Sequence, residues 1–356
     1  MDMADNAQFR GQAELLLPSA DLTGDMAFFT QIGFRLDQIY PSDDPAVARM
    51  SGHGMKLRLD RAVQAAAPVI HLLTNEPPAT ELKAPNGTLV KFLPASSRLE
   101  IPDAQHVFEV RRLKDGAPWV IGRAGMLYRD LIPDRLGGSI IASHIRIPDA
   151  GPVPDMVHYH TIGFQLIYCY RGWVRLVYED QGPPFILKAG DCVTQPPQIR
   201  HRVLESSENL EVIEIGVPAE HMTTIDHDMV LPTYQLRPDR EFDGQVFCHH
   251  QHDKAKWTAW KAEGFEVRDT GIRAATRGVA SVEVIRSIDE TMAGAVLTHN
   301  ADIHFTFVLE GALKLTMGEE SRSLTAGDAF VMPPGKEWCI VPEPVNTQLL
   351  QVSLPG

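Results

Sequence analysis

The sequence predicts a mainly β fold in which one domain is duplicated and a small α+β module precedes both copies. Three observations lead to this prediction. The 27 glycines and 26 prolines are spread along 356 residues, as expected for many short strands joined by turns. Landmarks of residues 101–220 recur at a nearly constant offset after residue 240. Near the N-terminus, the apolar pattern follows the order strand, helix and three strands.

The N-terminal pattern begins with a short apolar strand at 13–17. Asp21 precedes a helix over 22–32, in which apolar residues have helical spacing, and Gly33 ends it. Strands are then expected at 34–40, 46–50 and 55–59, which completes a βαβββ order. Two further strands, at 69–73 and 88–93, either complete this module or link it to the next domain. We therefore assign the module and its linker to residues 12–100.

Residues 20–36 of this module resemble the glyoxalase (vicinal oxygen chelate) module, present here as a single copy. In that family a residue of the first strand and a glutamate of the fourth strand are metal ligands. The matching positions hold Glu14 and Arg58, and an arginine cannot bind a cation. The resemblance therefore implies a docking or dimerising module without a metal.

From residue 101 the chain repeats itself. The offset is 139 residues at first and 137 after a shorter turn in the second copy, and an offset this steady indicates duplication of a whole domain. The matching pairs are Phe108 and Phe247, Arg129 and Arg268, His160 and His299, Gly172 and Gly311, Gly190 and Gly327, and Pro196 and Pro333.

The first copy contains a group of potential metal ligands. His158 and His160 are two residues apart on an expected strand, so both side chains point to the same side. Gln165 begins the next apolar run, and His201 follows the pair Pro196-Pro197. Three imidazoles and one amide oxygen suit Fe, Mn, Ni, Cu or Zn better than Ca or Mg.

These residues resemble the two signature motifs of the cupin superfamily. The first motif is His-x-His, a short gap, Glu, six residues and Gly. Here Gln165 replaces the glutamate, and Gly172 has the expected spacing. The second motif is Gly, five residues, then Pro-x-Gly-x-x-His. Gly190, Pro196 and His201 match it, and Gln198 replaces the turn glycine.

The cupin resemblance implies two antiparallel jelly-roll barrels in tandem, a bicupin. It divides the chain into a metal-binding first cupin at 101–220, a linker at 221–245, and a second cupin at 246–356. It implies one divalent transition metal, most often iron but also Mn, Ni or Zn, held by His158, His160, Gln165 and His201.

The second copy serves as an internal control for this site. His158 corresponds to Leu297, Gln165 to His304, and His201 to Trp338, whereas His160 is retained as His299. A leucine and an indole suit a packed apolar barrel, so the second cupin is expected to be degenerate. His299 and His304 keep a weakly bound second ion open as an alternative. The segment 248–252 is interpreted as a polar surface segment.

Alternation also predicts which neighbours face the site. Ile167 and Cys169 follow Gln165 on the same face and give it an apolar wall. On the last strand, Glu211 and Glu214 alternate, so at most one of them faces the pocket and is a candidate general base.

For function, the resemblance implies a mononuclear non-haem metal oxygenase of the dioxygenase type that acts on a small chelating organic substrate. One alternative is a non-catalytic cupin that binds a small ligand or has a regulatory role. Another is a cupin isomerase or hydrolase that uses no dioxygen.

Bulk properties exclude other classes of function. The net charge of −13 disfavours binding to nucleic acid, and no apolar run is long enough to span a membrane. The N-terminus does not have the pattern of a signal peptide. The four cysteines lack CxxC spacing and are interpreted as reduced thiols, which predicts a cytoplasmic protein. We expect a homodimer, since cupins and single glyoxalase-like modules often pair.

Overall fold

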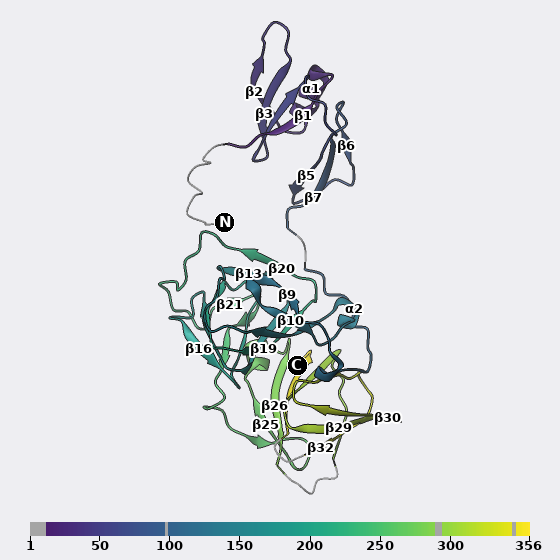
Figure 1. Cartoon of the computed structure of the whole chain (residues 1–356), viewed down its shortest axis with the longest axis vertical. Coiled ribbons are helices and arrows are strands. Elements are labelled where there is room, and N and C mark those ends of the chain that lie inside the picture. Colours follow the sequence, from purple (N-terminus) through teal and green to yellow (C-terminus); the bar gives the residue numbers. More distant parts are fainter. Residues whose placement is uncertain (1–11, 97–98, 289–293, 344–346) are drawn as a thin grey trace. The chain divides into compact units, whose positions relative to one another are not determined.

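The computed structural model describes residues 12–96, 99–288, 294–343 and 347–356, and it is dominated by strands (Figure 1). The chain divides into two compact units, Met1–Arg98 and Leu99–Gly356. Within the described residues, no helix combines the length and the apolar character needed to cross a membrane.

The N-terminal unit has the βαβββ order that the sequence predicts. Its first sheet has the strand order β1-β4-β3-β2, with β1 parallel to β4. Asp21 caps the helix by accepting a hydrogen bond from the Gly24 amide at 3.0 Å, and Phe29 is fully buried against the sheet. The elements are β1 (Leu15–Pro18), α1 (Leu22–Gln31), β2 (Arg35–Tyr40), β3 (Val47–Gly52) and β4 (Met55–Asp60).

A second, three-stranded sheet completes this unit. It consists of β5 (Val69–Thr74), β7 (Leu89–Pro94) and β6 (Leu82–Lys83), in that spatial order. Ile70 and Val90 share one apolar cluster with Phe29 and Leu57, so residues 69–94 belong to the core of the N-terminal unit and are not a linker. Arg58 lies 2.9 Å from Asp60 and 3.9 Å from Glu14. The likeness of this unit to a glyoxalase module remains a prediction.

The second unit contains the two tandem barrels that the sequence predicts, each made of two sheets. In the first barrel the larger sheet has the order β23-β17-β14-β19-β11-β10-β9, and the smaller sheet has the order β16-β15-β18-β13-β20, with β12 on β18. Their bounds are β9 (Val120–Ile121), β10 (Leu127–Asp130), β11 (Ile141–Ile147), β12 (Gly151–Pro152), β13 (His158–Thr161), β14 (Phe164–Arg171), β15 (Trp173–Tyr178), β16 (Phe185–Lys188), β17 (Cys192–Thr194), β18 (His201–Ser206), β19 (Leu210–Val217), β20 (Met222–Ile225) and β23 (Cys248–His250).

The second barrel has the orders β24-β25-β26-β33-β28-β31-β8 and β27-β32-β29-β30. Its bounds are β8 (Glu109–Arg111), β24 (Thr258–Ala259), β25 (Phe265–Asp269), β26 (Ser281–Ser287), β27 (Ala295–Leu297), β28 (Ile303–Glu310), β29 (Ala312–Met317), β30 (Glu320–Thr325), β31 (Ala329–Val331), β32 (Trp338–Pro342) and β33 (Gln348–Leu354). A separate hairpin joins β21 (Glu241–Phe242) to β22 (Gln245–Val246), and the short helices are η2 (Leu113–Asp115), η3 (Arg123–Gly125), α2 (Arg135–Gly138) and α3 (Ile272–Ala275).

Each copy of the repeat gives one strand to the barrel of the other copy. Strand β8, from the first copy, pairs with β31 of the second barrel, and β23, from the second copy, pairs with β17 of the first. The interpretation of 248–252 as a polar surface segment is therefore wrong, because its first three residues form β23 and His250 is buried. Likewise Met222–Ile225, expected at the start of a linker, forms β20 and pairs with β13.

Matched hydrogen bonds secure this exchange on both sides. The Asp328 carboxylate accepts the Leu113 amide at 2.7 Å, and at the equivalent place Asp191 accepts the His252 amide at 2.8 Å. Arg129 donates to the Gly327 carbonyl at 2.6 Å, and its counterpart Arg268 donates to that of Gly190 at 3.3 Å. The Gly-Asp turn of each barrel thus anchors the other copy.

The two barrels also share an apolar core. Alternate residues of β14 point out of the first barrel and pack against the equivalent strand of the second. This cluster contains Phe164, Leu166 and Tyr168 from one copy and Phe305 and Phe307 from the other. The intervening residues of β14 therefore point into the first barrel, toward the site described next.

Candidate metal centre

Three histidines meet inside the first barrel, and they are three of the four residues proposed from the sequence. His158 and His160 lie on β13, and His201 begins β18, directly opposite His158 in the antiparallel register. One ring nitrogen from each lies within 4.8 Å of the others, and all three side chains are buried. Among the described residues, no other group of three His, Cys, Asp or Glu side chains meets this criterion.

The second nitrogen of each ring is fixed by a hydrogen bond. Nδ1 of His158 lies 2.8 Å from the Met156 carbonyl, and Nδ1 of His201 lies 3.0 Å from the Ile199 carbonyl. A carbonyl only accepts, so these Nδ1 atoms carry the proton and Nε2 carries a lone pair. Nδ1 of His160 lies 2.9 Å from the Thr223 hydroxyl. Metal-ligating histidines are held in this way by their other nitrogen.

Burial keeps these imidazoles neutral. Burial and the neighbouring His158 lower the pKa of His160 to about 2, and burial lowers the pKa of His201 well below its usual value. The pKa of His158 is also lowered, by burial and by the charge of Arg123. His158 Nε2 is buried without a hydrogen-bond partner, which is costly unless another group occupies the space it faces. Neutral imidazoles with one orphaned lone pair fit a divalent transition metal.

The fourth proposed residue, Gln165, lies on β14 and is 1% exposed. Its Nε2 donates to Oε1 of Glu214 at 2.6 Å, so the amide is oriented by that carboxylate. The amide Oε1 is buried and has no hydrogen-bond partner. Of the two alternating acids on β19, Glu214 faces the pocket, whereas Glu211 points away and bonds His144 at 2.7 Å.

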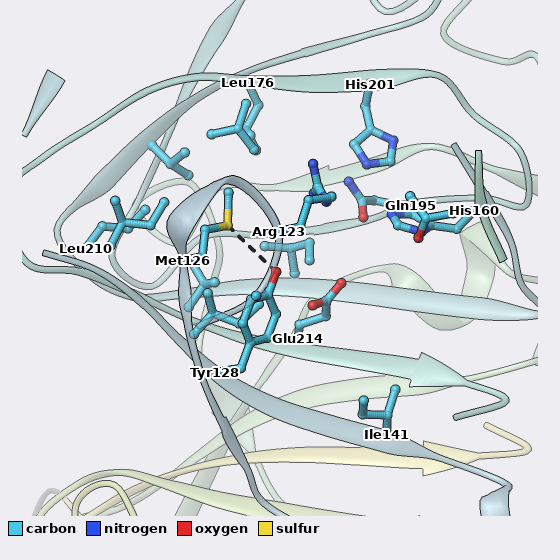
Figure 2. Close-up of a pocket in the computed structure, with 18 of the residues that line it drawn as sticks. Arg123, Met126, Tyr128, Ile141, His160, Leu176, Gln195, His201, Leu210 and Glu214 are labelled. Atoms are coloured by element: carbon cyan, nitrogen blue, oxygen red, sulfur yellow. Dashed lines mark hydrogen bonds between the residues drawn. The ribbon is translucent and has the colours of Figure 1, made fainter. Parts of the chain in front are cut away.

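A pocket of about 390 Å³ opens beside the histidines (Figure 2). At one end lie His160, His201 and Gln195, and at the other Leu210 and Met126, with Glu214 and Arg123 between them (Figure 2). The walls are mostly aliphatic and include Ile145, Ile167, Leu176 and Val212. The alternation that predicted Ile167 on this face is confirmed, and Cys169 lies in the adjoining core cluster of the barrel.

A partly buried ion pair lies at one side of the site. Arg123, in η3, pairs with Asp155, which is 5% exposed. Asp155 also accepts the Val203 amide at 2.9 Å, and its other oxygen lies 3.7 Å from His158 Nδ1. The charge of Arg123 is therefore balanced before any ligand enters the pocket.

Segments remote in sequence complete the centre. Thr223 and His221, from the stretch expected to be a linker, line the pocket, and the ring of His221 lies 5.5 Å from that of His160. Tyr178 stacks on His201 with a ring separation of 5.5 Å, and the ring of Phe247, from the second repeat, lies 4.6 Å from that of Tyr178. The sequence offered no signal for these contacts, because none follows from alternation within one strand.

The second barrel differs at the equivalent place. The rings of His299 and His304 stack with their centres 4.4 Å apart, but no third His, Cys, Asp or Glu joins them among the described residues. Trp338 and Leu297 fill the space where the first barrel has His201 and His158, and both belong to the apolar core. His299 Nδ1, His304 Nε2 and Trp338 Nε1 are buried without hydrogen-bond partners.

Comparisons with known proteins agree with this architecture. A family model described as Cupin domain matches residues 290–341, which lie in the second barrel. No curated protein matches the sequence. This similarity to a cupin domain lies in the barrel that lacks the three-histidine group among the described residues.

Solved structures extend the likeness to both barrels. Salicylate 1,2-dioxygenase from Pseudaminobacter salicylatoxidans has a TM-score of 0.54 at 17% identity, covering 72% of this chain and 87% of that one. A point mutant of Bacillus subtilis oxalate decarboxylase has a TM-score of 0.52 at 13% identity, covering 71% and 78%. The E. coli protein Ylba has a TM-score of 0.51 at 12% identity, covering 73% and 94%. At these identities the likeness establishes a shared fold.

Proposed function

We propose that this protein is a mononuclear metal-dependent oxygenase of the dioxygenase type, which acts on a small chelating organic substrate. His158, His160, Gln165 and His201 would hold one divalent ion, with iron as the first candidate. The observation that supports this most is the set of three buried neutral imidazoles, each fixed through Nδ1, with the orphaned Nε2 of His158 among them.

A bound ion would supply Lewis acidity and, if it is iron, the redox chemistry that dioxygen requires. The chain's own groups account for the rest. Glu214 fixes the Gln165 amide, so that its oxygen remains free of other partners. The aliphatic walls give an apolar lining to the part of the pocket that extends away from the histidines. None of the four ligands is charged, so an anionic chelating substrate would not compete with a ligand carboxylate.

Glu214 also favours a second candidate. A pocket carboxylate can move a proton to or from a chelated substrate, which is the chemistry of an isomerase or hydrolase that needs no dioxygen. A non-catalytic cupin that binds a small ligand is the remaining alternative. The N-terminal module would serve docking or pairing in each case, and we propose a cytoplasmic homodimer.

Metal analysis of the purified protein tests the site first. We expect about one ion per chain, strong loss in His160→Ala, and no loss in His299→Ala. These histidines occupy the same position of the repeat, so the second variant controls for the loss of a buried imidazole. Two ions per chain, with one lost in each variant, would contradict a single centre.

Oxygen uptake by the iron-loaded protein then tests the reaction, with catechols, gentisate-like acids and diketones as candidate substrates. Oxygen consumption in step with product formation supports the oxygenase. Turnover that continues under argon supports the isomerase or hydrolase. Stoichiometric metal without turnover on any of these compounds favours the binding protein.

A further inference from the structure

The pocket of the first barrel has two chemically different parts. The part next to His160 and His201 is polar, and the part toward Leu210 is aliphatic (Figure 2). The aliphatic side chains come from both sheets of the barrel, with Ile145 and Val212 on the larger sheet and Leu176 on the smaller one. A ligand of only two carbons held at the histidines would leave most of this apolar wall without a contact.

The charges of the pocket limit what can enter it. Arg123 is the only Lys or Arg among the described residues that line the pocket, and it is already paired with Asp155. Glu214 adds a carboxylate close to the Gln165 amide. A divalent ion on neutral ligands and one carboxylate leave a single net positive charge, which one negative charge on a ligand would neutralise.

From these two observations we infer the class of ligand, and the metal-binding part of this inference rests on the proposed function. The geometry points to a monoanionic chelating head at the histidines and an uncharged aliphatic or aromatic body along Leu176 and Leu210. A second carboxylate on the body would be buried among aliphatic side chains without a free cation, which is unfavourable.

A series of 2-oxo acids with increasing chain length measures how much the body of the ligand contributes to binding affinity. The probes are 2-oxobutanoate, 2-oxohexanoate and 2-oxooctanoate, which share one chelating head, and the dicarboxylate 2-oxoglutarate. Calorimetry with zinc-loaded protein measures binding without redox turnover. We expect Kd to fall roughly fourfold per added methylene, since each buried CH₂ contributes about that factor. We expect 2-oxoglutarate to bind at least about tenfold more weakly than 2-oxohexanoate, because its second carboxylate would be buried without a partner.

A matched pair of variants locates the body. Leu176→Ala should weaken 2-oxooctanoate about tenfold or more and leave 2-oxobutanoate nearly unchanged. Leu315→Ala, at the same position of the repeat in the second barrel, should affect neither ligand. This dependence on ligand length separates contact with the ligand from a general loss of stability. The ligand series does not depend on whether either variant folds.

Several results would overturn the inference. A Kd that does not change with chain length would show that the aliphatic wall is not used, and tighter binding of 2-oxoglutarate would show that the pocket accepts two negative charges. Equal affinity with and without zinc would show that the head of the ligand does not bind the metal. If the series behaves as expected but no oxygen is consumed, the oxygenase fails and the ligand class stands. If oxygen is consumed only with a small dicarboxylate, the oxygenase stands and the inferred ligand class fails.

Discussion

At the residue scale, the centre depends on how each ligand candidate is oriented. Gln165 departs from the glutamate of the cupin motif. In the structure its Nε2 donates a hydrogen bond to Oε1 of Glu214, with 2.6 Å between the two atoms. Gln198, which replaces the turn glycine, has φ of 64°, and the second copy keeps Gly335 there at 68°. A residue other than glycine in this conformation costs roughly 1 kcal/mol.

The role of Glu214 can be tested by removing its carboxylate. In Glu214→Leu the Gln165 amide loses its acceptor, so its oxygen is no longer held in place. We expect the Kd for the metal to rise about 10- to 100-fold, as for other residues that orient ligands. Competition with a chromophoric chelator measures this.

Glu211→Leu is the matched control on the same strand. Glu211 faces away from the pocket and bonds His144 and Arg146, so its loss should lower the free energy of unfolding and leave the Kd for the metal unchanged. Equal effects of the two variants on metal binding would contradict the positioning role of Glu214.

At the element scale, the exchanged strands bring each copy of the repeat into contact with the barrel of the other copy. The chain entering β23 places Phe247 against Tyr178, which stacks on His201. The chain entering β8 places Phe108 against the apolar core of the second barrel. In that barrel, Trp338 occupies the position that corresponds to His201. A side chain of the second copy thus packs against the aromatic ring that contacts His201.

Phe247→Ala and Phe108→Ala form a matched pair, because both are partly buried phenylalanines at the same position of the repeat. Each should lower the free energy of unfolding by about 2–4 kcal/mol. Only Phe247→Ala should also weaken metal binding, since Tyr178 and His201 lose their support. Denaturation and metal titration of both variants measure this, and weakened metal binding in Phe108→Ala would refute the separation.

At the scale of the whole molecule, buried histidines couple stability to pH. Outside the metal centre, burial lowers the pKa of His144, of His249, and of His250, the last to about 4. The histidines of the unfolded chain bind protons near pH 6.5, so between about pH 4 and 6.5 that chain holds more protons than the native state. The free energy of unfolding should therefore rise with pH in this window.

Urea denaturation of chelator-treated protein at several pH values tests this expectation. For His250 the contribution lost on acidification to about pH 4 is on the order of 3 kcal/mol. His250→Gln should flatten the pH dependence, whereas His227→Gln, at an exposed position, should leave it unchanged. A stability that is constant from pH 5 to 7 would contradict the neutral burial of these imidazoles.

The sequence by itself determined the repeat, the mainly β fold, the βαβββ order and the meeting of His158, His160 and His201. The repeat and the element order follow from spacing, and the shared face of His158 and His160 follows from alternation along a strand, whereas the addition of His201 was implied by the resemblance to the cupin motifs. Only the tertiary structure decided that β8 and β23 change barrels, that Thr223 holds His160, and that Asp155 neutralises Arg123. These contacts join segments far apart in sequence, and their free energy comes from packing and hydrogen bonding that no local pattern encodes.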